Sequence, residues 1–151
     1  MRWTRWVLGA LTLAACEAEG SHEGSPSGEQ AAAFVSTGDL DGWPEVRDCR
    51  HSIEHDLSYI RVLASPGAKT AYQERKEPFP EGAVLVKPEY ADEQCKSLVR
   101  LTAMRRPTTA PTWEWQELSP SLDVLQSGTL SACASCHASC DGGHDGVCAH
   151  P

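Results

Sequence analysis

Two cysteines and a histidine near the C-terminal end of the chain have the spacing of a covalent cofactor site. Cys133 and Cys136 are separated by two residues and His137 follows directly, which gives the pattern C-x-x-C-H. This is the attachment sequence of haem c. The two thiols can form thioethers with the vinyl groups on one edge of a porphyrin, and the adjacent imidazole then becomes the proximal ligand of the iron. The sequence therefore predicts one covalently bound haem c.

The same residues allow two other kinds of site. A C-x-x-C pair occurs in thioredoxin-like redox proteins, but there a strand precedes the pair and a helix follows it. Here Gly128 lies upstream and a glycine pair lies downstream at 142–143. A zinc site would recruit further ligands, and Cys140 and His144 are close enough in sequence to be considered. Haem is favoured over both, and a haem-free binding module held by disulfides or zinc is a third hypothesis.

The first sixteen residues have the features of an export signal. Arg2 and Arg5 give a positively charged start, and residues 6–15 form an apolar run. This run is shorter than the roughly 20 apolar residues that span a membrane, and it fits the centre of a signal peptide. It ends in Leu-Ala-Ala before Cys16, which looks like the lipobox of bacterial lipoproteins. Cys16 is therefore the expected lipid-bearing residue, and Glu17 after it favours an outer-membrane anchor facing the periplasm.

The chain is expected to have three parts: a signal peptide over residues 1–15, a tether over 16–30 and a haem domain over 31–151. The tether is rich in Gly, Ser and Glu, has no large apolar residue and cannot offset its ordering entropy by burial. The third part is long enough for one modest core. The net charge of −8 argues against nucleic-acid binding and is compatible with a basic redox partner.

Seven cysteines is an odd number for an exported protein. Lipid and haem would use three of them. The other four are Cys49, Cys95, Cys140 and Cys148. Four cysteines allow three pairings in an oxidising compartment, where disulfides persist. Cys49–Cys95 and Cys140–Cys148 are favoured, because the first joins the early segment to the core and the second closes a short glycine-rich loop. Free or differently paired thiols are the alternative.

The predicted site residues are expected to be positioned mainly by β-strands. Short apolar or alternating segments bounded by Pro or Gly predict strands. They lie at residues 59–64, 83–87, 98–104 and 113–118. Helices are expected at residues 31–35, 48–57 and 130–137. The predicted class is α+β and mainly β, an antiparallel sheet with flanking helices and the haem c motif near the C-terminus.

Other residues could bind a metal. Residues 51–55 spell H-x-x-E-H, an inverted zinc-protease motif, but no convincing segment with a third ligand follows. His144, His150 and Met104 are candidates for a sixth ligand of the haem iron. The two histidines lie in a loop or tail, where we expect them to be exposed. Met104 ends an apolar strand, where a position in the core is expected.

A series of short motifs over roughly residues 55–147 resembles the cytochrome P-460 family, which includes the cytochromes c′-β. The motifs are a histidine before an apolar strand at 55–62, a P-F-P-E-G turn and strand at 78–87, W-E-W at 113–115, the C-x-x-C-H sequence and D-G-V at 145–147. Two departures stand out. Cys148 replaces an aromatic residue common in the family, and Arg105 replaces a lysine of many relatives.

The resemblance implies a five-coordinate haem with an open position opposite His137. That position would bind or oxidise a small gaseous or nitrogenous ligand, such as nitric oxide or hydroxylamine. Members that oxidise hydroxylamine carry a bond between a lysine and a porphyrin carbon, for which Lys87 is the candidate here. Such an oxidoreductase would pass electrons to another periplasmic redox protein, and relatives commonly form homodimers. The alternative is a six-coordinate electron-transfer cytochrome of the c type.

Overall fold

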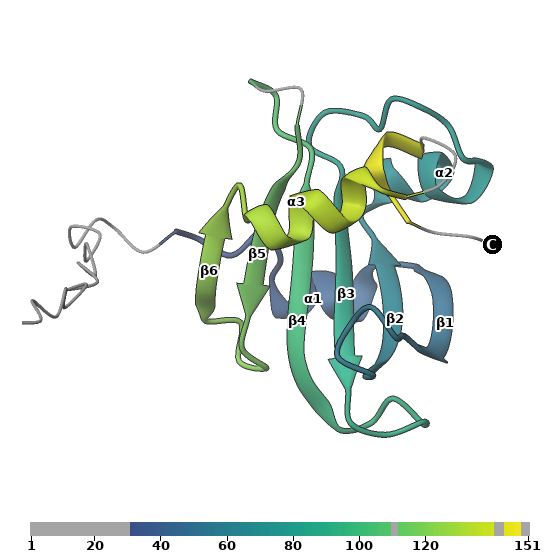
Figure 1. Ribbon diagram of the computed structural model, residues 1–151, viewed down its shortest axis with the longest axis vertical. Coiled ribbons are helices and arrows are strands. Elements are labelled where there is room, and N and C mark those ends of the chain that lie inside the picture. Colours follow the sequence, from purple (N-terminus) through teal and green to yellow (C-terminus); the bar gives the residue numbers. More distant parts are fainter. Residues whose placement is uncertain (1–30, 110–111, 141–143, 149–151) are drawn as a thin grey trace, which may run out of the picture.

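The computed structural model describes residues 31–109, 112–140 and 144–148, and its main feature is a six-stranded antiparallel sheet (Figure 1). The strands stand in the sheet in chain order. They are β1 (Glu45–His51), β2 (Tyr59–Ala64), β3 (Val84–Tyr90), β4 (Leu98–Arg105), β5 (Glu114–Leu118) and β6 (Val124–Gly128). The helices of the described part are α1 (Thr37–Gly42), α2 (Pro66–Glu74), α3 (Ser131–Ala138) and the 3-10 helix η1 (His144–Gly146). The predicted mainly β class with flanking helices is confirmed.

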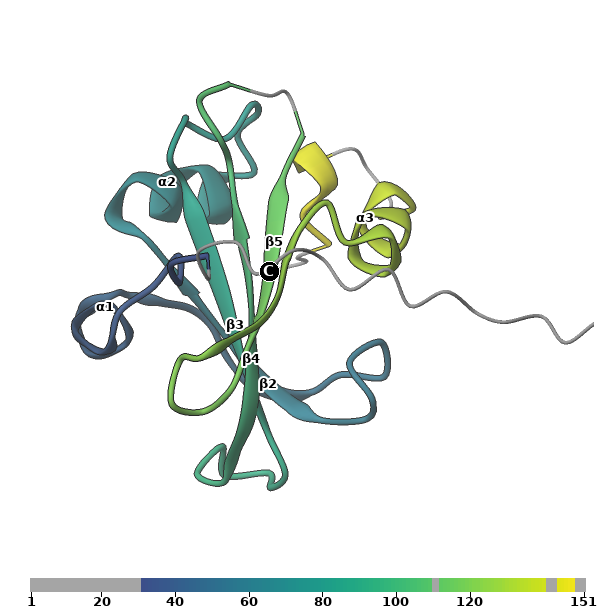
Figure 2. The same cartoon turned by 90° about the vertical axis from the view of Figure 1, so that its left-hand side faces the viewer.

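Apolar cores lie on both faces of the sheet, because successive residues of a strand point to opposite faces. In β3, Leu85 belongs to one core, whereas Val84 and Val86 belong to the other. The core around Leu85 is covered by α2 and contacts Cys133 of α3. The core around Val86 is covered by α1 and the chain before it. Figure 2 views the sheet nearly edge-on and shows α1 and α3 on opposite sides of it.

The four predicted strands all exist. The strand at 59–64 has the predicted bounds, and the other three differ by a few residues at their ends. Within the described ranges, five elements were not predicted: β1, α1, α2, β6 and the 3-10 helix η1. The edge strands β1 and β6 are partly exposed along their whole length, so they lack the apolar alternation that identifies a strand. Helix α2 has Pro66 in its first turn, a favoured position for proline.

Two of the predicted helices are wrong. Residues 48–51 belong to β1, and turns follow before β2 begins. Charged side chains at 45–50 resemble a helix surface, but pairing with β2 fixes them in an edge strand. Residues 31–35 form no helix, and Val35 packs into the core instead. The helix begins after it, where Ser36 and Asp39 form a capping box. The helix predicted at 130–137 is confirmed as α3.

Both favoured disulfides are present. Cys49 of β1 is bonded to Cys95 in the β3–β4 connection, and Cys140 after α3 is bonded to Cys148. The predicted signal peptide, the tether, Cys16 and His150 lie outside the described residues. Within the described ranges no helix is both long and apolar enough to span a bilayer.

Candidate functional site

Helix α3 carries the three residues of the C-x-x-C-H sequence. Among the described cysteines only Cys133 and Cys136 are free, whereas the others form disulfides. Cys133 is partly buried against the core and its burial raises the pKa of its thiol, while Cys136 is exposed. Residues three and four apart lie on one face of a helix, so His137 shares a face with Cys133. The helix therefore presents two unpaired thiols beside one imidazole.

The ring of His137 is held in one orientation and one tautomer. Its Nδ1 lies 2.7 Å from the carbonyl oxygen of Gly146. Because a carbonyl only accepts hydrogen bonds, Nδ1 must carry the proton, and Nε2 keeps a free electron pair. Trp115 packs edge-on against the ring with 4.5 Å between centroids. Burial lowers the pKa of His137 to about 4, so the imidazole is neutral at pH 7. Metal-bound histidines commonly show this arrangement, with the second nitrogen donating to a carbonyl or carboxylate.

The loop that supplies this carbonyl is fixed at several points. Gly146 has φ +74°, a conformation that favours glycine. The disulfide between Cys140 and Cys148 closes the loop from both sides. The indole nitrogen of Trp113 donates to the carbonyl oxygen of Asp145 at 2.6 Å, next to Gly146. The loop therefore holds the acceptor of the His137 proton in a defined place.

His137 lines a cavity of about 50 Å³ whose walls are mostly apolar. The apolar lining includes Val62, Leu85, Val86, Ala103, Met104 and Trp115. Sites for small molecules and cofactors are lined mainly by apolar side chains with a few placed polar groups. Cys133 packs against the same core residues that form the walls. Free thiols, an imidazole whose Nε2 keeps its electron pair and apolar walls are the groups that haem c requires, so the residue types present fit that cofactor.

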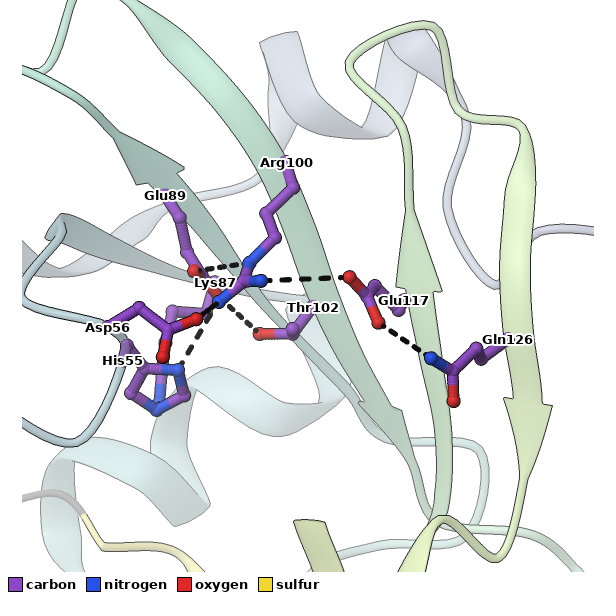
Figure 3. A network of polar contacts seen from close by, with 8 residues as sticks. All are labelled: His55, Asp56, Lys87, Glu89, Arg100, Thr102, Glu117 and Gln126. Atoms are coloured by element: carbon purple, nitrogen blue, oxygen red, sulfur yellow. Dashed lines mark hydrogen bonds and ion pairs between the residues drawn. The ribbon is translucent and has the colours of Figure 1, made fainter. Parts of the chain in front are cut away.

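Lys87 lies in the wall of the same cavity. It stands on β3 two residues after Leu85, so both face the cavity side of the sheet. Burial lowers the pKa of Lys87 to about 8. Its Nζ is 2.5 Å from Nε2 of His55, which lies in the turn between β1 and β2 (Figure 3). The structure thus brings the predicted Lys87 and His137 to one cavity, although they lie on different elements.

A buried carboxylate supports this lysine and histidine. Glu89 is 0% exposed, and its Oε1 lies 3.4 Å from Nδ1 of His55. Arg100 donates from Nε to the other oxygen of Glu89 at 2.7 Å, and its NH2 group reaches Asp56 at 2.5 Å (Figure 3). Burial alone would raise the pKa of Glu89, but hydrogen bonds from His55 and Arg100 outweigh it and lower the pKa. Glu89 is therefore ionised at pH 7.

Sequence analysis missed Glu89 and Arg100. The predicted strand ended at residue 87, two residues before Glu89. Only the longer β3 of the structure places Glu89 on the same face as Lys87. Arg100 likewise gave no signal, since its partner lies on another strand.

The proposed sixth ligands have different surroundings. Met104 is buried, as expected, and lines the cavity with His137. The expectation that His144 is exposed is wrong: it is 2% exposed and packs on Phe79 with 5.4 Å between ring centroids. His144 is buried because it packs on Phe79 and lies between the two cysteines of the Cys140–Cys148 disulfide. Burial lowers the pKa of His144, and its Nδ1 lies 3.9 Å from Glu77.

Two zinc arrangements considered from the sequence do not form. The H-x-x-E-H residues are not on a helix, since His51 ends β1 and His55 lies in the turn that follows. The zinc site of the C-x-x-C pair with Cys140 and His144 lacks one thiolate, because Cys140 is in a disulfide. A further set, not considered from the sequence, is His137, Cys140 and Cys148, whose ligand atoms all lie within 4.8 Å of one another. The two sulfurs are bonded to each other, however, and zinc binds thiolates.

A scan against models of known protein families finds no match to this chain, and a search of curated proteins finds no relative.

Proposed function

We propose that the chain is a periplasm-facing mono-haem c lipoprotein of the cytochrome P-460 type. Cys133 and Cys136 would form thioethers with one haem, and Nε2 of His137 would bind its iron. The open position would bind or oxidise a small nitrogen compound such as hydroxylamine or nitric oxide. The observation that carries the proposal is the contact between His137 and the Gly146 carbonyl, which leaves Nε2 as the only available electron pair of a neutral imidazole at an apolar cavity.

Several residues of the chain would have distinct roles at the haem site. A bound haem iron supplies ligand binding and electron exchange. The Gly146 carbonyl and Trp115 orient the imidazole of His137. The apolar walls exclude water from the cavity, which strengthens every polar interaction within it. Lys87 brings an amine to the same cavity and is the candidate for a lysine–porphyrin bond.

Export and a lipid anchor are part of this proposal. The two disulfides are typical of proteins outside the reducing cytoplasm and support it. Cys16 would carry the lipid, and an acidic surface would meet a basic periplasmic redox protein. The proposal includes assembly as a homodimer, which only the resemblance to the cytochrome P-460 family supports.

A second candidate function is electron transfer by a six-coordinate haem. Met104 favours it, because its side chain is buried in the wall of the cavity that His137 also lines. Two strong axial ligands make an electron carrier, whereas an open position binds small ligands.

A haem stain after denaturing electrophoresis tests the attachment. We expect the full chain to stain, and Cys133→Ser with Cys136→Ser to abolish the covalent stain. Ser135→Ala is the matched control, because Ser135 lies between the two cysteines and is exposed. The control is expected to stain like the parent. An unstained parent chain, produced with an active haem attachment system, would overturn the proposal.

An absorption spectrum with and without carbon monoxide separates the two candidate functions. An open position predicts a spectrum that changes with carbon monoxide, and a lysine bond predicts a reduced Soret band displaced far to the red. Low-spin bands that ignore carbon monoxide would establish the six-coordinate carrier. In that case Met104→Leu, which keeps the apolar volume, should restore the response to carbon monoxide.

A further inference from the structure

Three polar side chains from separate elements line the cavity beside His137. Arg47 comes from β1, Tyr72 from α2 and Lys87 from β3. A guanidinium and an ammonium can only donate hydrogen bonds, and a tyrosine hydroxyl can donate one as well. The walls around these groups are mostly apolar. The cavity therefore brings hydrogen-bond donors and positive charge together at one place.

Two of these donors are buried without an acceptor. Tyr72 is only 7% exposed, and neither its hydroxyl nor Nε of Arg47 has a partner with hydrogen-bond geometry among the residues that the structure describes. Burial raises the pKa of Tyr72 against the opposing effect of the Arg47 guanidinium, so the hydroxyl keeps its proton at pH 7. Buried polar groups without a partner are costly and rare in native proteins. An acceptor inside the cavity would satisfy both donors.

Lys87 adds a positive charge to the same cavity. Burial lowers its pKa to about 8, which still leaves most of the side chain charged at pH 7. Nε2 of His55 lies 2.5 Å from Nζ and can accept one of the ammonium protons, so the others remain free to donate (Figure 3). Glu54 and Glu89 favour the ammonium from a greater distance. Within the described ranges no carboxylate forms an ion pair with Lys87 or Arg47, so both charges lack a counterion in contact.

We propose that this cavity binds one small inorganic anion, held by Lys87, Arg47 and Tyr72. A cavity of about 50 Å³ has room for a few groups of water size, since one water needs about 10–15 Å³. Nitrite has this size, whereas phosphate esters and nucleotides are too large. The oxygens of nitrite accept hydrogen bonds, and bonds from charged donors are stronger than those between neutral groups. The anion would also neutralise part of the positive charge in the cavity.

This inference rests on the proposed function for its choice of anion, because nitrite is a small nitrogen compound, and it deepens that function by naming the charge of the ligand. The anion site itself consists of residues of the chain and does not require haem. An ammonium has no electron pair for a bond to a porphyrin carbon. The inference therefore applies to an open iron position without the lysine–porphyrin bond.

Binding of sodium nitrite to the full chain as purified tests the proposal. Equilibrium dialysis at pH 7 measures the number of nitrite ions bound per chain and their dissociation constant. Sodium gluconate keeps the ionic strength constant, because its anion is too large for the cavity. The haem content is measured on the same sample. We expect one nitrite ion to bind per chain.

Two variants each remove one donor. Lys87→Met keeps an unbranched side chain without charge or donor, and we expect it to weaken nitrite binding by about tenfold or more, as for a hydrogen bond from a charged group. Tyr72→Phe removes only the hydroxyl, and a loss of about fivefold is expected for a neutral hydrogen bond. Lys69→Met and Tyr90→Phe are the matched controls, because Lys69 is exposed on α2 and Tyr90 does not line the cavity. Both controls should bind nitrite as the parent does.

A parent chain that binds no nitrite would overturn the inference. Equal dissociation constants in the parent, Lys87→Met and Tyr72→Phe would also overturn it, because the ion would then bind at the iron or elsewhere. Porphyrin attached to Lys87, as measured by mass spectrometry of peptides, would exclude it too. A sample without haem would count against the proposed function, but dialysis of that sample would still decide whether the anion site exists. Circular dichroism checks the folding of each variant, and Tyr72→Phe, which removes only a buried oxygen, provides a second route should Lys87→Met unfold.

Discussion

At the scale of single residues, the ring orientation and the tautomer of His137 depend on the backbone conformation of one glycine. Gly146 places its carbonyl oxygen 2.7 Å from Nδ1 and does so at φ +74°. A Cβ built at this position would meet the His137 carbonyl oxygen at 3.6 Å, which is an ordinary contact. The cost of a larger residue here is therefore one of backbone conformation and not of space.

Gly146→Ala is expected to lower the free energy of unfolding by about 1 kcal/mol, because alanine disfavours positive φ. The shifted carbonyl should also loosen the His137 ring, which NMR of the imidazole reports. Gly67→Ala is the control, since Gly67 lies in α2 with open space around it and alanine favours helices. Urea unfolding measures both variants. Equal losses in the two would show that the loop conformation around Gly146 carries no special cost.

Glu89 predicts a pH dependence of stability. Its pKa is lowered in the folded state, so its ion pair with Arg100 stabilises the fold above the ordinary glutamate pKa, near 4.5, and this contribution is lost as the pH falls through the lowered pKa. Glu89→Gln should therefore cost about 2 kcal/mol at pH 7, a typical value for hydrogen bonds to charged groups. Near pH 2 the variant and the parent should converge in urea unfolding.

The control for this measurement is Glu74→Gln, an exposed carboxylate paired with Lys76. Exposed ion pairs contribute about 0–1 kcal/mol, so its effect should be small at either pH. A Glu89→Gln variant as stable as the parent at pH 7 would contradict the structural role of the buried pair.

At the scale of elements, the two disulfides should contribute unequally. Cys49–Cys95 closes a separation of 46 residues and Cys140–Cys148 one of only 8. In the chain-entropy description, the longer loop gives about 4 kcal/mol and the shorter about 2.6 kcal/mol. Replacing both cysteines of each pair by alanine should therefore lower stability more for Cys49–Cys95, as measured by urea unfolding of the two double variants.

The shorter disulfide should instead have the larger effect on the site. It closes the loop that carries Gly146, so its removal frees the acceptor of the His137 proton. We expect the imidazole resonances of His137 to broaden in Cys140→Ala/Cys148→Ala and to stay sharp in Cys49→Ala/Cys95→Ala. The reverse order would contradict a clamping role for the loop.

Sequence analysis identified the strands that contain many buried apolar residues. Strands such as β2 and β3 have both faces covered and a dense apolar pattern. Edge strand β1 has charged residues instead, and these were mistaken for a helix because only its pairing with β2 distinguishes the two. The disulfides were predictable because cysteine chemistry limits the choices to three pairings.

The candidate site was predictable only in part. The C-x-x-C-H sequence is local, so its three residues could be identified without the fold. The contacts of Lys87 with His55, and of Glu89 with Arg100, join residues 32 and 11 positions apart. They depend on the register of neighbouring strands, which a pattern along the chain does not contain. The burial of His144 likewise depends on how the closed loop packs on Phe79.

At the scale of the whole molecule, the proposed lipid anchor predicts where the protein is found. The parent chain should partition into the detergent phase of a membrane extract, because a diacylglycerol on Cys16 would hold it there. Cys16→Ala should not carry this lipid, and labelling with a radioactive fatty acid measures the difference. Cys49→Ala/Cys95→Ala is the control and should still be labelled. Equal labelling of the parent and Cys16→Ala would contradict the anchor.

Because the six strands stand in the sheet in chain order, the molecule can assemble in the order in which it is synthesised. Each hairpin finds its partner among residues that have just emerged, and such local pairing favours rapid folding. Cys49 and Cys95 are both synthesised before Cys133 and Cys136, so they can form their disulfide while these two thiols are still absent. The order of synthesis would thereby favour the Cys49–Cys95 disulfide and keep Cys133 and Cys136 from forming incorrect disulfides.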